Sequence, residues 1–237
     1  MTHDAETLTQ RETLQQVTAA QLLSLLPRMD RLMVIGQSGG VTHERIGPVE
    51  TVRAEGDRIR LAGACHDSDI DPHQVVSIVL DTGSVMRDKV YPRLDFLGRD
   101  GAPVFSVVGM EGLDPFTAPL SGFPRGPAAP RAERPADSAT PAEFADDDPA
   151  RAPFAAALDS AAEIRITYDR AGLRQSWQGR IEALKPAMGF LNVMTPDFHL
   201  HLRGGTVSGW QQQPGRRIAL GHDGQPAGLI LESGVFA

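Results

Sequence analysis

A long series of short segments with the composition of β-strands most constrains how this 237-residue chain can fold. Val, Ile and Leu are frequent in these segments, and turn signals such as Gly39-Gly40, Gly56-Asp57 and Asp100-Gly101 stand between them. The predicted strands are residues 32–35, 49–54, 58–62, 75–80, 93–97, 104–108, 163–168, 174–184, 190–194, 200–203, 206–212, 217–220 and 227–231. This spacing is typical of an antiparallel sheet or barrel with few helices.

Two helices are predicted outside these strands. Residues 8–31 place five apolar side chains on one stripe: Leu14, Val17, Leu22, Leu25 and Leu26. Thr18-Ala19-Ala20-Gln21 matches a capping box, and Pro27 is expected to end or bend the helix. A second, short helix is expected at residues 154–161.

The composition changes sharply between the two sets of strands. Residues 121–152 are rich in Pro and Ala and hold few side chains that could form a core, which predicts a linker. The chain then divides into residues 1–120, an N-terminal helix plus a first β-rich repeat, the linker, and residues 153–237, a second β-rich repeat. A flexible chain of about 33 residues spans roughly 30 Å, so the two halves can dock directly.

The two halves share short motifs in the same order. Gly47–Glu50 corresponds to Gly179–Glu182 at an offset of 132 residues, Asp71–His73 to Asp197–His199 at 126, and Gly98–Gly101 to Gly221–Gly224 at 123. Each match alone could be a coincidence between common turn sequences. Three matches in order favour an internal duplication, in which loop trimming removes the 9 residues between the first and last offsets.

The densest group of possible ligand side chains lies in residues 188–210. Polar and apolar residues alternate there, so one face of a predicted strand carries Asp197, His199, His201 and Arg203. The opposite face carries Phe198, Leu200 and Leu202. Gly204-Gly205 predicts a tight turn, after which residues 206–212 are expected to return antiparallel beside this strand.

The polar face has three interpretations. It could be a solvated sheet face, or a pocket for an anionic, partly apolar ligand in which Arg203 pairs with a carboxylate. It could also bind a metal ion, because Asp197, His199 and His201 are suitable ligand types. Three alternate residues of one strand spread over roughly 13 Å, so only neighbouring pairs could chelate one ion.

Composition excludes several functions. A net charge of −7 and a pI near 5.5 argue against a general nucleic-acid binder. The polar, acidic start lacks the features of a secretory signal, and no apolar run reaches the ~18 residues of a membrane span, so a cytoplasmic protein is expected. Cys65 is the single cysteine, which excludes an internal disulfide and a cysteine-only metal site. No nucleophile-base motif, phosphate-binding loop or dinucleotide fingerprint is present.

Several of these segments resemble the HemS/ChuX family of bacterial haemin-utilisation proteins, which includes haemin-degrading factors and haem-trafficking proteins. Residues 189–210 are similar to the family's G-W-L-N-V…P-D-F-N-L-H-L-R…S-A-W segment. Val41–Gly47 resembles V-H-E-x-V-G, Asp95–Gly101 resembles F-F-D-x-x-G, and Ile70-Asp71 lies where the family has L-D-L-R. The resemblance covers about residues 32–116 and 163–234.

The resemblance implies an α+β fold of two tandem duplicated, β-rich, antiparallel and split-barrel-like halves with a few helices. It implies a cytoplasmic haem-binding protein of haemin uptake and utilisation, which traffics or stores haem. Its partners would be haem and a haem-uptake transporter or a haem-receiving protein. Two alternatives stay open: a haem-degrading enzyme, and a degenerate, non-haem interaction module of the same fold.

The chain departs from the family where the family carries its axial histidine. That region opens the second half and is here the Pro/Ala-rich segment, and no histidine lies between His73 and His199. We therefore predict that haem iron is held by His73 or His199, with His73 favoured because it lies where the family directs a side chain at haem. His201 matches a family histidine, as a ligand or as a hydrogen-bonding residue. Arg203 and Arg87 are predicted to pair with the haem propionates, and no catalytic residue is predicted.

Overall fold

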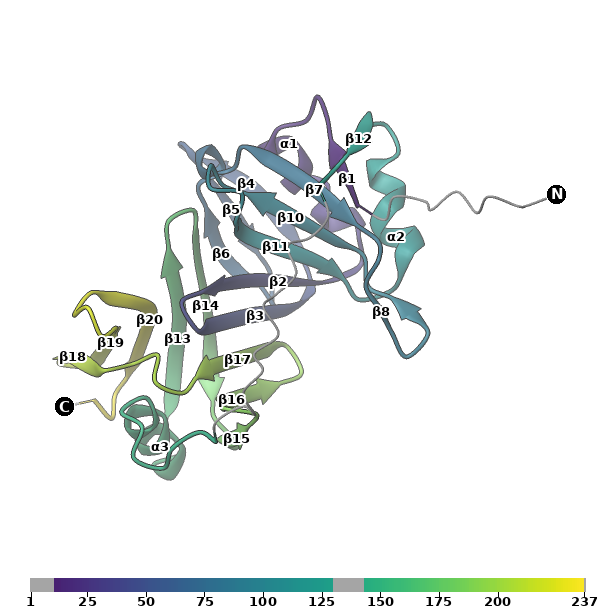
Figure 1. Ribbon diagram of the computed structural model, residues 1–237. Helices are drawn as coiled ribbons and strands as arrows, with labels where there is room; N and C mark the ends of the chain where they lie inside the picture. Colours follow the sequence, from purple (N-terminus) through teal and green to yellow (C-terminus); the bar gives the residue numbers. More distant parts are fainter. Residues whose placement is uncertain (1–10, 130–142, 237) are drawn as a thin grey trace.

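The computed structural model describes residues 11–129 and 143–236, and about half of them belong to two antiparallel sheets (Figure 1). Within these residues the larger sheet has ten strands, in the order β12 (Arg125–Pro127), β1 (Arg11–Leu14), β7 (Ser77–Asp81), β10 (Arg93–Leu97), β11 (Pro103–Gly109), β2 (Arg31–Ser38), β3 (Val41–Pro48), β17 (Phe198–Arg203), β16 (Phe190–Thr195) and β15 (Lys185–Ala187). The smaller sheet has eight, in the order β18 (Gly209–Gln213), β19 (Arg216–Leu220), β20 (Pro226–Ser233), β13 (Glu163–Arg170), β14 (Leu173–Arg180), β6 (Asp67–Ile70), β5 (Arg58–Ala62) and β4 (Thr51–Glu55).

The remaining described elements are short. A separate hairpin is formed by β8 (Val85–Met86) and β9 (Lys89–Val90). The helices are α1 (Ala19–Leu23), α2 (Leu113–Thr117) and α3 (Arg151–Asp159), with 3₁₀ turns η1 (Leu26–Arg28), η2 (Pro72–Gln74) and η3 (Ala118–Leu120). The prediction of antiparallel sheets with few helices is confirmed, and β5 and β10 have the predicted bounds.

Each sheet is built from both halves of the chain. Strand β17 of the second half pairs with β3 of the first, from Phe198 opposite Arg45 to Leu202 opposite Val41. Strand β6 of the first half pairs with β14 of the second, from Ile70 opposite Leu173 to Ser68 opposite Gln175. Figure 1 shows the yellow-green β17 beside the dark β3. Each half thus supplies three strands that extend the sheet of the other half.

From β7 to β15, eight strands of the larger sheet have the same order as the eight strands of the smaller sheet, and β12 and β1 are additional. Strands β2 to β7 match β13 to β18 at an offset of 132 residues, whereas β10 and β11 match β19 and β20 at 123. The difference arises between β7 and β10, where residues 82–92 hold the β8–β9 hairpin and the second half has only residues 214–215. The turns that follow are built alike: Gly98 N donates to Ala102 O at 2.8 Å, and Gly221 N to Gln225 O at 2.9 Å.

The strand register contradicts one of the three motif matches, that of Asp71–His73 with Asp197–His199. Because Leu173 faces Ile70 and the equivalent Val41 faces Leu202, Ile70 corresponds to Leu202. His199 therefore corresponds to Asp67 rather than to His73, which lies beyond the end of β6 in η2.

The long N-terminal helix predicted at residues 8–31 is wrong in its extent. Residues 8–10 lie outside the described part, Arg11–Leu14 forms β1 at the edge of the larger sheet, and the helix is confined to α1. Positive φ values at Gln16 (55°) and Asp30 (55°) interrupt the helical backbone on either side. The capping box is confirmed, with Gln21 N donating to Thr18 Oγ1 at 3.2 Å and Thr18 N to Gln21 Oε1 at 2.9 Å.

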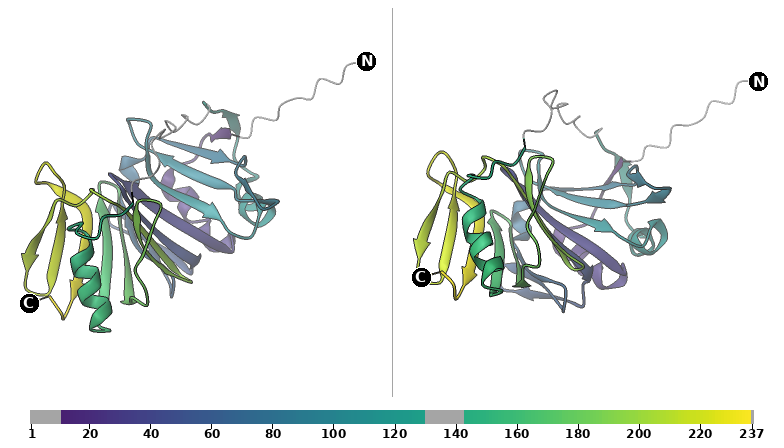
Figure 2. Two further views of the ribbon diagram at one scale, coloured as in Figure 1. Left: turned by 60° about the horizontal axis from the view of Figure 1, so that its bottom comes forward. Right: turned by 90° about the horizontal axis from the view of Figure 1, so that it is seen from below.

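Both described ends of the predicted linker pack on the sheets, and residues 130–142 lie outside the described part. Strand β12 pairs with β1, while Phe144 and Ala150 are buried. The Asp148 carboxylate accepts hydrogen bonds from Ala150 N and Gly205 N, both at 2.8 Å. Figure 2 shows α3, which follows directly, alongside the strands at the C-terminal end of the molecule. The three-part division of the chain stays a prediction.

The core lies between the two sheets. Phe198 of the larger sheet stacks on Trp177 of the smaller one, with ring centroids 4.7 Å apart and an interplanar angle of 10°. At Gly36 the sheets approach so closely that a Cβ atom would stand 2.7 Å from the Tyr168 ring. The larger sheet therefore has one face in the core and one turned away from it.

Two histidines are buried in or beside this core. His43 Nε2 donates to Ile166 O at 3.2 Å and Nδ1 accepts from Gln175 Nε2 at 3.0 Å, so the neutral ring is fully bonded. His66 Nε2 lies 3.0 Å from Gly47 O. Burial lowers the pKa of His43 to about 3 and that of His66 to about 4. Both are neutral in the folded protein at pH values where an unfolded chain protonates them.

We expect the free energy of unfolding to fall as the pH drops below about 6.5. The folded pKa values of His43 and His66 are depressed, so the unfolded chain binds protons below pH 6.5 that the folded protein does not bind. The free energy of unfolding is therefore unaffected by these histidines above pH 6.5 and falls progressively toward pH 4. Each histidine costs about 1.4 kcal/mol per pH unit inside that window. Urea unfolding at pH 7.5, 6.0 and 5.0 measures the effect, and a constant free energy across this range would contradict it.

Candidate functional site

The candidate site lies on the face of the larger sheet that is turned away from the core. Along β17 the predicted alternation is confirmed from Phe198 onward: Phe198, Leu200 and Leu202 are fully buried, whereas His199 and His201 are half-buried and Arg203 is exposed. Asp197 precedes the strand and pairs with Arg45 at 3.4 Å, so it does not join the two histidines as predicted. In the antiparallel ladder, His199 faces Met194 on β16 and Glu44 on β3. Directly paired residues share a face, so these side chains meet on the outer surface.

The strand after Gly204-Gly205 does not return beside β17, which corrects the predicted hairpin. The partners of β17 are β16 and β3, and β18 pairs with β19 in the smaller sheet. The chain crosses between sheets because Val207 is buried and Ser208 N donates to Leu220 O at 2.8 Å. The turn itself exists, and Asp148 fixes it through Gly205 N.

Three side chains form a compact cluster on this face: Glu44, His199 and His201. Glu44 Oε2 is 3.1 Å from His199 Nδ1 and 3.8 Å from His201 Nε2, and one donor atom from each residue lies within 4.8 Å of the others. Burial would raise the pKa of Glu44, but the interactions with His199 and His201 outweigh it and lower the pKa to about 2. Glu44 is therefore a carboxylate at neutral pH.

Asn192 fixes the orientation of His201. Its side-chain nitrogen donates to Lys185 O at 2.8 Å and to Phe190 O at 3.3 Å, which leaves Oδ1 as an acceptor. His201 Nδ1 lies 2.6 Å from that oxygen and must donate to it. The neutral imidazole of His201 then has its lone pair on Nε2, the atom that faces Glu44.

The structure brings only some of the predicted site residues together. His199, His201 and Arg203 lie on one face of β17, as predicted. His73 lies in η2 and is exposed, with its backbone N–H donating to Asp71 Oδ1 at 3.0 Å. Arg87 is exposed between β8 and β9, beyond the other end of β7, so it does not lie beside His73. Strands β3, β2, β11 and β10 separate β17 from β7 in the sheet.

Glu44 is the site residue that the sequence did not identify as a partner of His199. The histidine next to it in the sequence, His43, lies on the opposite, buried face of β3. Strand β3 contains the polar segment Thr42-His43-Glu44-Arg45, so it lacks the run of apolar residues by which strands are predicted from sequence. Recognising β3 and its register against β17 would have identified the cluster.

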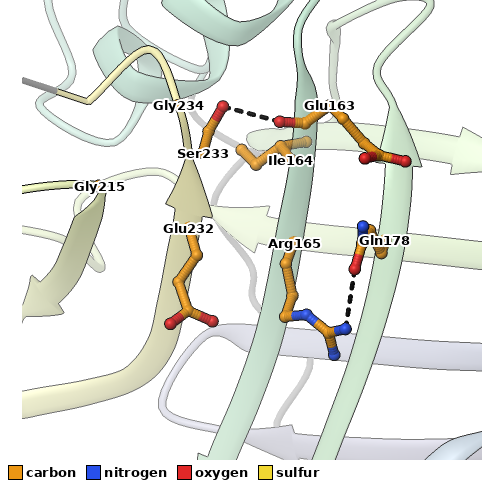
Figure 3. A pocket seen from close by; sticks show the side chains of 8 residues that line it. All are labelled: Glu163, Ile164, Arg165, Gln178, Gly215, Glu232, Ser233 and Gly234. Atoms are coloured by element: carbon orange, nitrogen blue, oxygen red, sulfur yellow. Dashed lines mark hydrogen bonds between the residues drawn. The ribbon is translucent and has the colours of Figure 1, made fainter.

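Two cavities lie away from this cluster. One of about 520 Å³ opens on the smaller sheet, where Glu163 and Glu232 flank Arg165 and Arg165 bonds Gln178 at 2.8 Å (Figure 3). A second, of about 310 Å³, is lined largely by arginines and acidic residues, with Arg165 paired to Asp67 at 3.0 Å. Neither lining contains a histidine or cysteine, so neither offers an imidazole or thiolate to iron.

Within residues 11–129 and 143–236, no helix is long and apolar enough to cross a membrane.

No protein-family model and no curated protein sequence matches this chain. Several solved structures match it. The chain is similar to ChuS of Escherichia coli O157:H7, described as a heme degrading enzyme, with a TM-score of 0.74 and 16% identity, covering 94% of this chain and 81% of ChuS. It is also similar to holo-PhuS, a heme-binding protein from Pseudomonas aeruginosa, with a TM-score of 0.69 and 17% identity over the same shares. The chain therefore has the fold of these proteins, and the resemblance noted in the sequence is confirmed at the level of fold.

Proposed function

We propose that this protein binds haem in the cytoplasm and takes part in bacterial haem utilisation. The fold match carries this proposal, because it spans 94% of the chain and includes both halves. ChuS is described as a heme degrading enzyme and PhuS as a heme-binding protein, so haem is the ligand that both share.

Trafficking or storage fits this molecule better than degradation. Oxygen chemistry on haem depends on a distal pocket of controlled polarity and access. Here the two cavities on the smaller sheet lack histidine, and His73, His199 and His201 are half-buried or exposed. A haem bound at the surface can pass directly to a second protein. A haem-uptake transporter or a haem-receiving protein is the partner that this role requires.

His73 is the iron ligand that we propose. Among the described histidines its ring is the one without a hydrogen bond: His43, His66 and His222 face backbone carbonyls, His199 faces Glu44 and His201 faces Asn192. An exposed imidazole with both nitrogens unengaged can bind iron without breaking an existing bond, and the exposed Val76 nearby offers apolar contact. On β17 the alternative is His199, with Arg203 for a propionate.

A haemin titration followed by absorbance tests the ligand. We expect the wild-type protein to shift and intensify the Soret band, and His73→Ala to weaken binding and move the band. His222→Ala is the control, because its ring bonds Gly205 O and belongs to neither η2 nor β17, so both properties should stay unchanged. If His199→Ala alone weakens haemin binding and shifts the Soret band, the iron ligand is His199 on β17. If the wild type does not bind haemin, the remaining hypothesis is the non-haem interaction module.

A degrading activity is the second candidate, since the similar ChuS is described as a heme degrading enzyme. We expect the haem complex to keep its Soret band when an electron donor and oxygen are supplied together. Loss of the band with release of iron would instead identify haem as the substrate.

We further propose that the chain consists of two duplicated, split-barrel-like halves. The support is the shared strand order and the constant offset of 132 residues from β2/β13 to β7/β18.

A further inference from the structure

The Glu44, His199 and His201 cluster contains an electrostatic feature that haem binding at His73 does not explain. Asn192 holds the proton of neutral His201 on Nδ1, so the lone pair of Nε2 faces the Glu44 carboxylate 3.8 Å away. Two acceptors that face each other at this distance repel unless a cation lies between them. A proton on Nε2 or a bound metal ion could supply it.

The donor set favours a metal ion. Two imidazoles and one carboxylate are the ligands of many catalytic zinc sites and of non-haem iron sites. Metal bonds of 2.0–2.2 Å place two ligand atoms about 3–3.5 Å apart at tetrahedral or octahedral angles. Glu44 Oε2 and His199 Nδ1 already stand 3.1 Å apart, and side-chain rotation can close the remaining gaps within the 4.8 Å cluster.

The surroundings also suit an ion. Glu44 has a side-chain exposure of 14%, against 23% for His199 and 31% for His201, so the carboxylate lies deepest and the imidazoles open toward solvent. Backbone pairing of β3 with β17 fixes Glu44 opposite His199, and Asn192 fixes the ring of His201. Such outer hydrogen-bond partners are typical of metal-binding histidines.

We propose that Glu44, His199 and His201 form a binding site for one divalent first-row transition-metal ion. Three protein ligands on one side leave coordination positions open toward solvent. The carboxylate comes from the first half of the chain and both imidazoles from the second, so the site exists only when β3 and β17 are paired. It does not depend on haem binding.

Titration of the haem-free, full-length protein with Co²⁺ and Zn²⁺ tests this proposal. We expect one equivalent of Co²⁺ with the visible spectrum of nitrogen and oxygen ligation, displaced by Zn²⁺. Glu44→Gln, which keeps the shape but removes the charge, should weaken binding by more than the roughly 10–100-fold that loss of an outer hydrogen-bond partner costs. His201→Ala should do the same, Asn192→Ala should cost about 10–100-fold, and His222→Ala should bind as the wild type does.

Circular dichroism of each variant in chelator separates lost ligation from lost folding, and Asn192→Ala leaves every metal ligand in place. A wild type that binds no stoichiometric Co²⁺ at micromolar concentration would overturn the proposal, as would a folded Glu44→Gln that binds like the wild type. Haemin titration of the same samples keeps the two proposals apart. Haemin binding without Co²⁺ binding overturns the metal site alone, and the reverse result overturns the haem proposal alone.

Discussion

A chain cut between residues 130 and 142 is expected to remain one folded particle. The β3–β17 and β6–β14 ladders join the two halves by backbone hydrogen bonds, and Phe198 of one sheet packs on Trp177 of the other. Separation of the halves would expose these strand edges and the apolar core between the sheets to water. The free energy required for this is far larger than the free energy lost when one covalent link between the halves is cut. Replacing residues 134–139 with a protease recognition sequence, cutting it and running size-exclusion chromatography measures the outcome.

The uncut protein is the control for this experiment. Both fragments should elute together at its volume and separate only in denaturant. Each half produced alone should aggregate, because it lacks the three strands that extend its sheet. Fragments that elute separately and folded in plain buffer would show that the shared sheets contribute little to the association.

Phe198→Ala is expected to lower the free energy of unfolding by about 3–5 kcal/mol, the usual cost of removing a buried phenyl ring. Phe198 is 0% exposed and contacts the rings of Trp177 and His43, at centroid distances of 4.7 and 4.8 Å. The thermal midpoint should fall by roughly 10 °C. Urea unfolding and calorimetry at pH 7.5 measure both quantities.

His199→Ala is the matched control, because it is the next residue of the same strand and points to the opposite face. Its loss removes an interaction with Glu44 and no core contact, so its cost should stay within about 1 kcal/mol. Equal losses for the two variants would contradict the assignment of the two faces.

The strands were predictable where apolar residues dominate, as in β5 and β10, or where they alternate, as in β17. Periodicity reports which face of a segment is buried, so it found the polar face of β17 correctly. It does not report which strand lies beside another. For that reason Glu44, supplied by a neighbouring strand from the other half of the chain, was missed.

The predicted hairpin after Gly204-Gly205 shows the same limit. A tight turn with these glycines can return the chain beside the same strand or direct it to another layer. The choice depends on distant residues: Asp148 binds Gly205 N, and Leu220 accepts from Ser208 N. At the N-terminus, pairing of β1 with β7 overrode the apolar stripe that favoured a helix.

Pairing between the halves also determines when the protein can fold during synthesis. The first half leaves the ribosome with the partner edges of β3 and β6 empty, because β17 and β14 are still to be made. Contacts between residues this far apart in the chain form slowly, and unpaired strand edges invite association with other chains. We therefore expect the nascent first half to depend on chaperones until Leu173–Arg180 and Phe198–Arg203 emerge.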